Sequence, residues 1–219
     1  MRRRRFLTGA AVTLAGLAAA GAGGGELFLL RRMKFEELGD AVVASVALPE
    51  LLPTRDERAM QSIESGFATT LRFEATVVRT KSMVPVARRV RIVKIQWNPW
   101  RERYVVQTTD QGRGAAIRYY SKRDAAIAHA ISLDRMRVAR ASSLERGPSS
   151  TYALTIVGQR NPIEPESRIA QDRREDARAR GSDDLSAFSR WIGVFVQSAP
   201  RAEKTYAVRS SPAFYLVPR

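Results

Sequence analysis

The stretch that decides the fold is 84–109, which reads Val-Pro-Val-Ala-Arg-Arg-Val-Arg-Ile-Val-Lys-Ile-Gln-Trp-Asn-Pro-Trp-Arg-Glu-Arg-Tyr-Val-Val-Gln-Thr-Thr. Two runs rich in β-branched residues flank Asn98-Pro99, a combination that predicts a β-hairpin. Pro99 presets the backbone angle that a type I turn needs at its second position, and the Asn98 side chain can bond the backbone beyond it. Trp97 and Tyr104 are then expected to have a packing role in the hairpin.

The neighbouring segment 67–80 predicts the next strand. Leu71, Phe73 and Ala75 alternate with charged or hydroxylic residues, a pattern typical of a strand with one buried and one wet face. Within the hairpin the apolar phase shifts between Ile92 and Val93, which predicts either a bulge or a strand covered on both faces.

Two short helices are expected among the strands. Thr54 and Glu57 form a capping box, and Met60, Ile63 and Phe67 follow on one face. Ser121 opens the second helix, 121–133, with Ala125, Ile127, Ala128 and Ile131 available for packing. Further strands are predicted at 40–48, 115–120, 136–141 and 151–157, and no βαβ alternation occurs. The fold class is therefore mainly β, an antiparallel β-sandwich-like domain with one or two short helices.

Composition divides the chain into four regions. Residues 33–160 form the β-rich core domain, and 161–187 carry many charges of both signs, which predicts an exposed loop or helix. Residues 188–219 return to strand-like patterns that would complete the domain. Residues 1–25 precede the fold and have the layout of an export signal.

The leader resembles a twin-arginine export signal. Arg3, Arg4, Phe6 and Leu7 fit the Arg-Arg-x-Phe-Leu pattern, although Arg2 and Thr8 depart from its usual flanks. An ordinary secretory signal is the alternative for the same arginines. The leader is either cleaved after its Ala- and Gly-rich run or kept as an anchor extended by residues 27–30 and ended by arginines. Both cases predict an exported protein, periplasmic or anchored to the cytoplasmic membrane with its domain outside.

Few residues could support catalysis. The chain has no Cys and one His, so zinc sites and the usual nucleophile arrangements are nearly excluded. His129 lies on the predicted second helix and is expected to be solvated. We identify no catalytic, cofactor-binding or metal-binding residue, which favours a non-catalytic protein; an unrecognised envelope hydrolase is a third option after the two binding functions below.

Basic residues gather around the hairpin. The formal charge is +15, and residues 79–118 hold ten basic against two acidic residues. Interleaved aromatic residues make this a possible polyanion-binding sheet, with these candidate residues: Arg88, Arg89, Arg91, Arg101 and Arg103. The structural alternative is that the arginines provide solubility and the tryptophans pack the hairpin.

The location that the leader predicts favours some partners over others. Outside the cytoplasm the abundant anions are lipid headgroups and envelope polysaccharides, and a protein partner is also possible. The leading function is thus a binding or assembly module on the periplasmic side of the membrane, delivered by export machinery. The alternative, a basic polyanion- or nucleic-acid-binding protein, requires that the N-terminus is not an export signal, so nucleic acid is the less favoured partner.

The hairpin also carries a family resemblance. Residues 96–106, the predicted helix 121–133, Arg137-Val138-Ala139 and the strand beginning at Tyr152 resemble a family of small exported bacterial proteins known as a domain of unknown function (DUF4390). The resemblance would cover residues 38–197, with the charged segment 168–184 and the extension after Pro200 as departures. It implies no established activity, so no catalytic residue follows from it.

Overall fold

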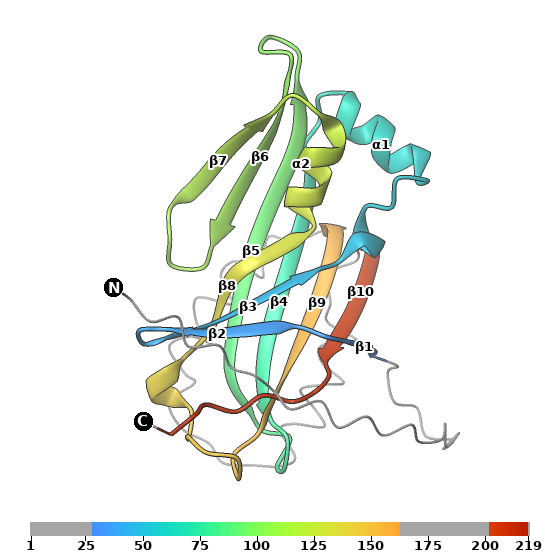
Figure 1. The fold of residues 1–219 in the computed structure, drawn as a ribbon. Helices are drawn as coiled ribbons and strands as arrows, with labels where there is room; N and C mark the ends of the chain where they lie inside the picture. Colours follow the sequence, from blue (N-terminus) through green and yellow to red (C-terminus); the bar gives the residue numbers. More distant parts are fainter. Residues whose placement is uncertain (1–27, 163–201, 219) are drawn as a thin grey trace, which may run out of the picture.

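The computed structural model describes residues 28–162 and 202–218. These residues form two β-sheets that pack face to face, a seven-stranded sheet in the order β1-β10-β9-β4-β5-β6-β7 and a three-stranded sheet in the order β2-β3-β8 (Figure 1). The neighbouring strands are antiparallel except β1, which pairs in parallel with β10. The predicted β-sandwich-like fold is confirmed.

The larger sheet contains the hairpin at one side and the last described strand near the other. Its central pairs are β4 with β5 and β4 with β9. Its strands are β1 Leu29–Arg31, β4 Thr69–Arg79, β5 Pro85–Asn98, β6 Arg103–Asp110, β7 Ala115–Tyr120, β9 Tyr152–Pro162 and β10 Ala202–Ser210.

The smaller sheet lies across the larger one, and both α-helices lie at the same end of the molecule as the β5–β6 turn (Figure 1). Its strands are β2 Lys34–Leu38, β3 Ala41–Ala47 and β8 Ser132–Arg140. The helices are α1 Glu57–Glu64 and α2 Arg123–Ala130, with the 3₁₀ turns η1 Pro49–Leu51 and η2 Ala141–Ser143.

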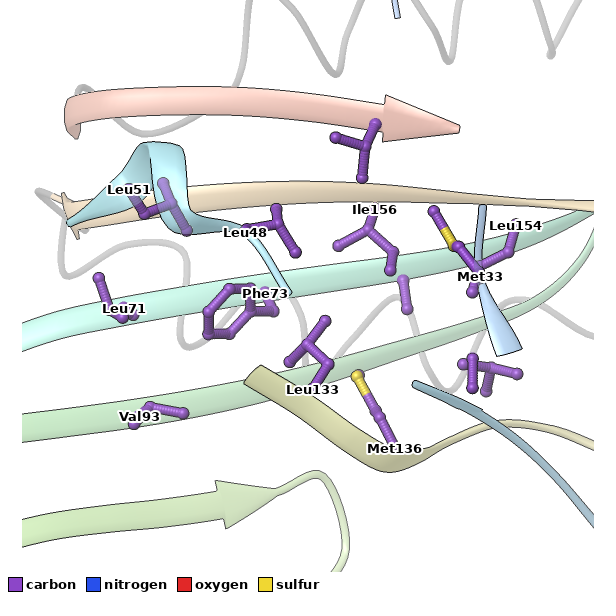
Figure 2. Packing of buried hydrophobic residues seen from close by; sticks show 14 of the residues in the cluster. Met33, Leu48, Leu51, Leu71, Phe73, Val93, Leu133, Met136, Leu154 and Ile156 are labelled. Atoms are coloured by element: carbon purple, nitrogen blue, oxygen red, sulfur yellow. The ribbon is translucent and has the colours of Figure 1, made fainter. Parts of the chain in front are cut away.

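The core fills the space between the two sheets. Phe73 on β4 is completely buried, and Figure 2 shows its ring between Leu48 and Leu133, which come from the η1 region and from β8. Leu154 and Ile156 extend the same layer on β9. Because apolar area is what drives the packing of two sheets, this layer holds the sandwich together.

The central strands are covered on both faces. The prediction of a wet face on β4 is wrong, because Glu74 and Thr76 are buried as well as the apolar residues between them. On β5, Val93 faces the core and Ile92 is half-buried on the opposite face. The register shift between β4 and β5 falls at Val77/Val78, so coverage on both faces, and not a bulge at Ile92, explains the shifted apolar phase.

The first helix begins two residues later than its capping box predicts. The cap is Asp56, whose carboxylate accepts a hydrogen bond from the Ala59 amide at 3.2 Å. Asp56 also binds an arginine on β9, so tertiary contacts favour it over Thr54. Met60 and Ile63 are buried as predicted, whereas Phe67 is 76% exposed.

The second helix packs with part of the predicted face, because Ile127 is buried and Ile131 packs against the core as expected. It begins at Arg123 without a side-chain cap, and Ser121 lies before it. Ala126, Ile127 and Ala130 are buried, whereas Ala125 and Ala128 are exposed. The prediction is therefore wrong for Ala125 and Ala128, and Ala126 and Ala130 pack in their place.

Only parts of the two chain ends lie among the described residues. Leu29–Arg31 belongs to the seven-stranded sheet as β1, and β10 supplies the expected C-terminal strand. The leader, the charged segment 163–187 and the predicted strand at 188–196 lie outside the described residues. In 28–162 and 202–218, no helix is long and apolar enough to cross a membrane.

Candidate functional site

The turn of the β5–β6 hairpin is held by its own backbone and by one side chain. The Asn98 carboxamide oxygen accepts hydrogen bonds from the amides of Trp100 and Arg101, both at 3.1 Å. Glu102 completes the turn with a positive φ of 48°. The turn stands at the end of the hairpin (Figure 1) and leaves Trp100 92% exposed.

The other aromatic residues of the hairpin have a packing role. Trp97 and Tyr104 are directly paired across β5 and β6, with ring centroids 4.7 Å apart and ring planes at 57°. Burial raises the pKa of the Tyr104 phenol. These two residues therefore behave as predicted, which leaves Trp100 as the hairpin aromatic available to a partner.

The five candidate arginines do not share one surface. Arg88 points to the sheet face opposite the core and forms a two-point ion pair with Glu74, at 2.9 and 3.0 Å. Arg91 is only 7% exposed and forms a similar pair with Asp110, at 2.5 and 2.9 Å. Adjacent residues of a strand point to opposite faces, so Arg89 lies on the same side of β5 as Arg91.

Arg101 and Arg103 remain at the end of the hairpin, exposed to solvent. The Arg101 guanidinium lies 5.4 Å from the centre of the Tyr119 ring, a cation–π arrangement. Strand register places Tyr119 opposite Val105, and Arg103 shares that face of β6. The structure thus places Arg101 against an aromatic residue of β7 and Arg103 on the same face.

Further residues extend this exposed face over β5 and β7. Ile117 is 52% exposed and Tyr119 44%. The register aligns Lys94 with Gln107 and Gln107 with Ile117, so all three side chains lie on one face. Among the described residues of β5–β7 and their turns, the acidic residue next to this face is Glu102, which lies between Arg101 and Arg103 in the chain. We call the following residues the hairpin surface: Lys94, Trp100, Arg101, Arg103, Ile117 and Tyr119.

Sequence reasoning missed half of the hairpin surface. Lys94, Ile117 and Tyr119 were not candidates, although the period of two along 115–120 carried a signal for Ile117 and Tyr119. Pairing β6 with β7 in register would have placed Ile117 and Tyr119 beside Arg103. The missing information was the register, which the turn at 111–114 sets.

His129 is half-buried, not solvated as predicted. It packs beside Tyr120, with ring centroids 5.6 Å apart. Burial lowers the pKa of its imidazole, and the positive charges of Arg118 and Arg91 lower it further. In the described part of the chain, no group of three or more His, Cys, Asp or Glu residues could hold a metal ion.

One comparison with known proteins gives a match. The family model described as Domain of unknown function (DUF4390) matches residues 29–160, which run from β1 almost to the end of β9. This range starts before the expected residue 38 and ends before residue 197. No match was found among the curated proteins or the solved structures.

Proposed function

The chain belongs to the family described as Domain of unknown function (DUF4390), and we propose that it is an exported, non-catalytic binding module that docks on an anionic lipid surface of the cell envelope. The hairpin surface carries this proposal. Trp100 is 92% exposed at the turn, and Arg101 and Arg103 stand beside it. An exposed aromatic residue next to basic side chains suits the interface between lipid headgroups and acyl chains.

The charged and the aromatic side chains would each contribute to the free energy of such docking. Each Lys or Arg near an anionic membrane contributes about 1 kcal/mol, and Lys94, Arg101 and Arg103 are available on one face. Trp100 would bury its ring in the interface, where its indole N–H still finds a hydrogen-bond acceptor. The two contributions differ in salt dependence, because screening weakens only the charged one.

The leader supports a location outside the cytoplasm. Arg3, Arg4, Phe6 and Leu7 fit a twin-arginine signal, and the alternatives of cleavage and retention place the domain on the same side of the membrane. Without the leader, the same hairpin surface would equally suit nucleic acid, whose phosphates pair with arginine and whose bases stack on aromatic rings.

Vesicle binding tests the docking surface. The purified chain should co-sediment with vesicles of one-third phosphatidylglycerol in phosphatidylcholine, and not with phosphatidylcholine alone. Trp100→Ala should weaken binding about tenfold at all salt concentrations, because one buried tryptophan contributes 1.5 kcal/mol or more. Arg101→Glu should weaken it by a similar factor at low salt and by less at high salt, since screening removes the charged contribution.

Two matched controls lie away from the hairpin surface. Lys81→Glu makes the same kind of charge reversal in the exposed turn after β4, at the other end of the β5 strand, and Leu38→Ala removes an apolar side chain that is 47% exposed. Both should bind vesicles like the unchanged chain. Lipid docking would be refuted if the controls lost as much vesicle binding as the hairpin-surface variants. It would also be refuted if the chain bound single-stranded DNA or heparin more strongly than vesicles.

Cell fractionation tests export separately. A tagged full-length chain should appear outside the cytoplasm, and Arg3→Lys with Arg4→Lys should leave it inside, because the twin-arginine pathway reads that pair. As a control, Arg2→Lys keeps the pair and should be exported. A tagged chain found soluble in the cytoplasm without these substitutions would contradict the proposed location, whatever the vesicle results.

A further inference from the structure

A cleft of about 300 Å³ opens where the two sheets meet, away from the hairpin surface. One wall is formed by β5 and the β6–β7 turn, and the other by β8, which crosses β5 in Figure 1. Its size is at the lower end of small-molecule sites. Four arginines line it, two from each wall: Arg89, Arg113, Arg137 and Arg140.

The one acidic residue in the lining is already neutralised. Asp110 is held by Arg91 through two hydrogen bonds of 2.5 and 2.9 Å, and Arg91 also reaches the Asp134 carbonyl of β8 at 3.4 Å. Within the described ranges, none of the four lining arginines forms an ion pair with a carboxylate. The four arginines therefore give the cleft a positive charge that exceeds that of the carboxylates around it, which favours an anion.

Asp40 is the other carboxylate close to this wall. It lies outside the lining, and its oxygen accepts a hydrogen bond from the Ser142 amide at 2.8 Å. That hydrogen bond, helped by the charges of Arg140 and Arg137, lowers its pKa. Asp40 is thus satisfied by the backbone of η2, and it offsets only part of the charge in the cleft.

A bulge in β8 brings two of the arginines to the same wall. Val42 pairs with Ala139 and Val43 with Arg137, so Val138 is the extra residue of β8. In a regular strand, residues three apart point to opposite faces. The bulge breaks that alternation, and Arg137 and Arg140 both line the cleft.

One donor of Arg137 lacks a partner in the described part of the chain. The Nε of Arg137 is buried and has no hydrogen-bond partner among the described residues. Leaving a buried donor of a charged group unsatisfied is costly, and such cases call for an explanation. Because this nitrogen is buried, an oxyanion in the cleft would instead be bound by the terminal nitrogens of the guanidinium groups, whose fork matches phosphate oxygens in geometry and charge.

From these observations we propose that the inter-sheet cleft is a binding site for a compact, multiply charged phosphate group, held by Arg89, Arg113, Arg137 and Arg140. The ligand joins the two sheets, because each wall supplies two of its arginines. The site takes a phosphate ester or diphosphate, whether from a soluble molecule or from a lipid headgroup. It does not depend on the hairpin surface.

Calorimetry with inorganic pyrophosphate tests the site. At constant ionic strength, pyrophosphate should bind the full chain with a stoichiometry of one and raise its melting temperature, and chloride should not. Arg137→Gln and Arg113→Gln should each raise the Kd for pyrophosphate about tenfold or more, because each removes a charge-assisted hydrogen bond. Arg113 lies exposed in the turn, so its variant remains informative if Arg137→Gln fails to fold.

The matched control is Arg135→Gln, an exposed arginine of β8 that pairs with Glu36 at 3.2 Å. It should bind pyrophosphate like the unchanged chain, and so should Trp100→Ala and Arg101→Glu. Failure of vesicle docking with intact pyrophosphate binding would therefore refute the proposed function alone. No pyrophosphate binding beyond the effect of ionic strength, or equal loss in Arg135→Gln, overturns the cleft site.

Vesicles distinguish the source of the phosphate group. A soluble ligand predicts that the cleft variants bind phosphatidic acid vesicles normally. A headgroup ligand predicts that the same variants lose vesicle affinity and that pyrophosphate competes with the vesicles. The vesicle result decides only the source of the phosphate group. The cleft site itself requires that pyrophosphate binds the unchanged chain and that the cleft variants weaken this binding.

Discussion

Replacing Phe73 by alanine is expected to lower the free energy of unfolding by about 3–5 kcal/mol. The side chain is completely buried on the central strand β4, between residues of the smaller sheet and the η1 region (Figure 2). Removing the ring leaves a cavity, because the close-packed sheets cannot move enough to fill it. Urea unfolding followed by tryptophan fluorescence measures the loss, which should appear as a lower midpoint with an unchanged slope.

Phe67→Ala is the matched control, since it removes the same side chain where 76% of it is exposed. Its effect should stay within about 0.5 kcal/mol. The comparison also tests the corrected assignment of the α1 face, on which Phe67 was expected to pack. Equal losses in Phe67→Ala and Phe73→Ala would contradict the core described above.

Replacing Asp56 by alanine is expected to cost about 3 kcal/mol. The Asp56 carboxylate caps α1 and binds Arg160, whose side chain is only 5% exposed, at 2.8 Å. Arg160 keeps Glu203 at 2.9 Å and the Leu51 carbonyl at 3.1 Å. The variant thus leaves a buried guanidinium with one carboxylate in place of two, and it also removes the helix cap.

Asp56→Asn separates these two roles. The asparagine oxygen can still cap the helix, so the loss that remains reports the ion pair. Glu57→Gln, which removes an exposed negative charge from the next residue, is the control and should cost at most about 0.5 kcal/mol. If Asp56→Asn were as stable as the unchanged chain, the pair with Arg160 would contribute nothing.

The same pair predicts a pH dependence. The hydrogen bond from Arg160, followed by that from the Ala59 amide, lowers the pKa of Asp56 below its ordinary value. A lowered folded-state pKa stabilises the fold above the unfolded pKa of about 3.9, and this stability is lost as the pH falls through the folded pKa. The stability gap between the unchanged chain and Asp56→Asn, measured in urea at pH 7, 5, 4 and 3, should therefore narrow at the acid end. A constant gap would contradict this assignment.

Local patterns were sufficient for the hairpin and the fold class. Asn98-Pro99 predicts the turn because the angle of a proline and the hydrogen bonds of an asparagine side chain depend only on neighbouring residues. Alternation along 69–79 and 152–157 likewise predicts strands, since the period of two is a property of the strand itself. The short loops between them then favour antiparallel pairing.

The role of each arginine could not be predicted in the same way. Arg88, Arg89 and Arg91 are nearly adjacent in the sequence, yet their surroundings differ. Arg88 pairs with Glu74 on β4, Arg89 lines the cleft, and Arg91 forms an ion pair with Asp110. Ion pairs depend on distances between strands, and these are set by register. Three arginines that are close together in the sequence therefore have three different environments in the fold.

The sequence by itself determined a mainly β domain, its hairpin turn, the presence of the first helix and the packing role of Trp97 and Tyr104. These features follow from periodicity and turn chemistry, which are local. The tertiary structure alone decided that Arg101 contacts Tyr119 on the face that Arg103 shares, and that Arg137 and Arg140 line one cleft with Arg89 and Arg113. Those groupings join segments far apart in the chain, and they depend on strand register and on the bulge at Val138.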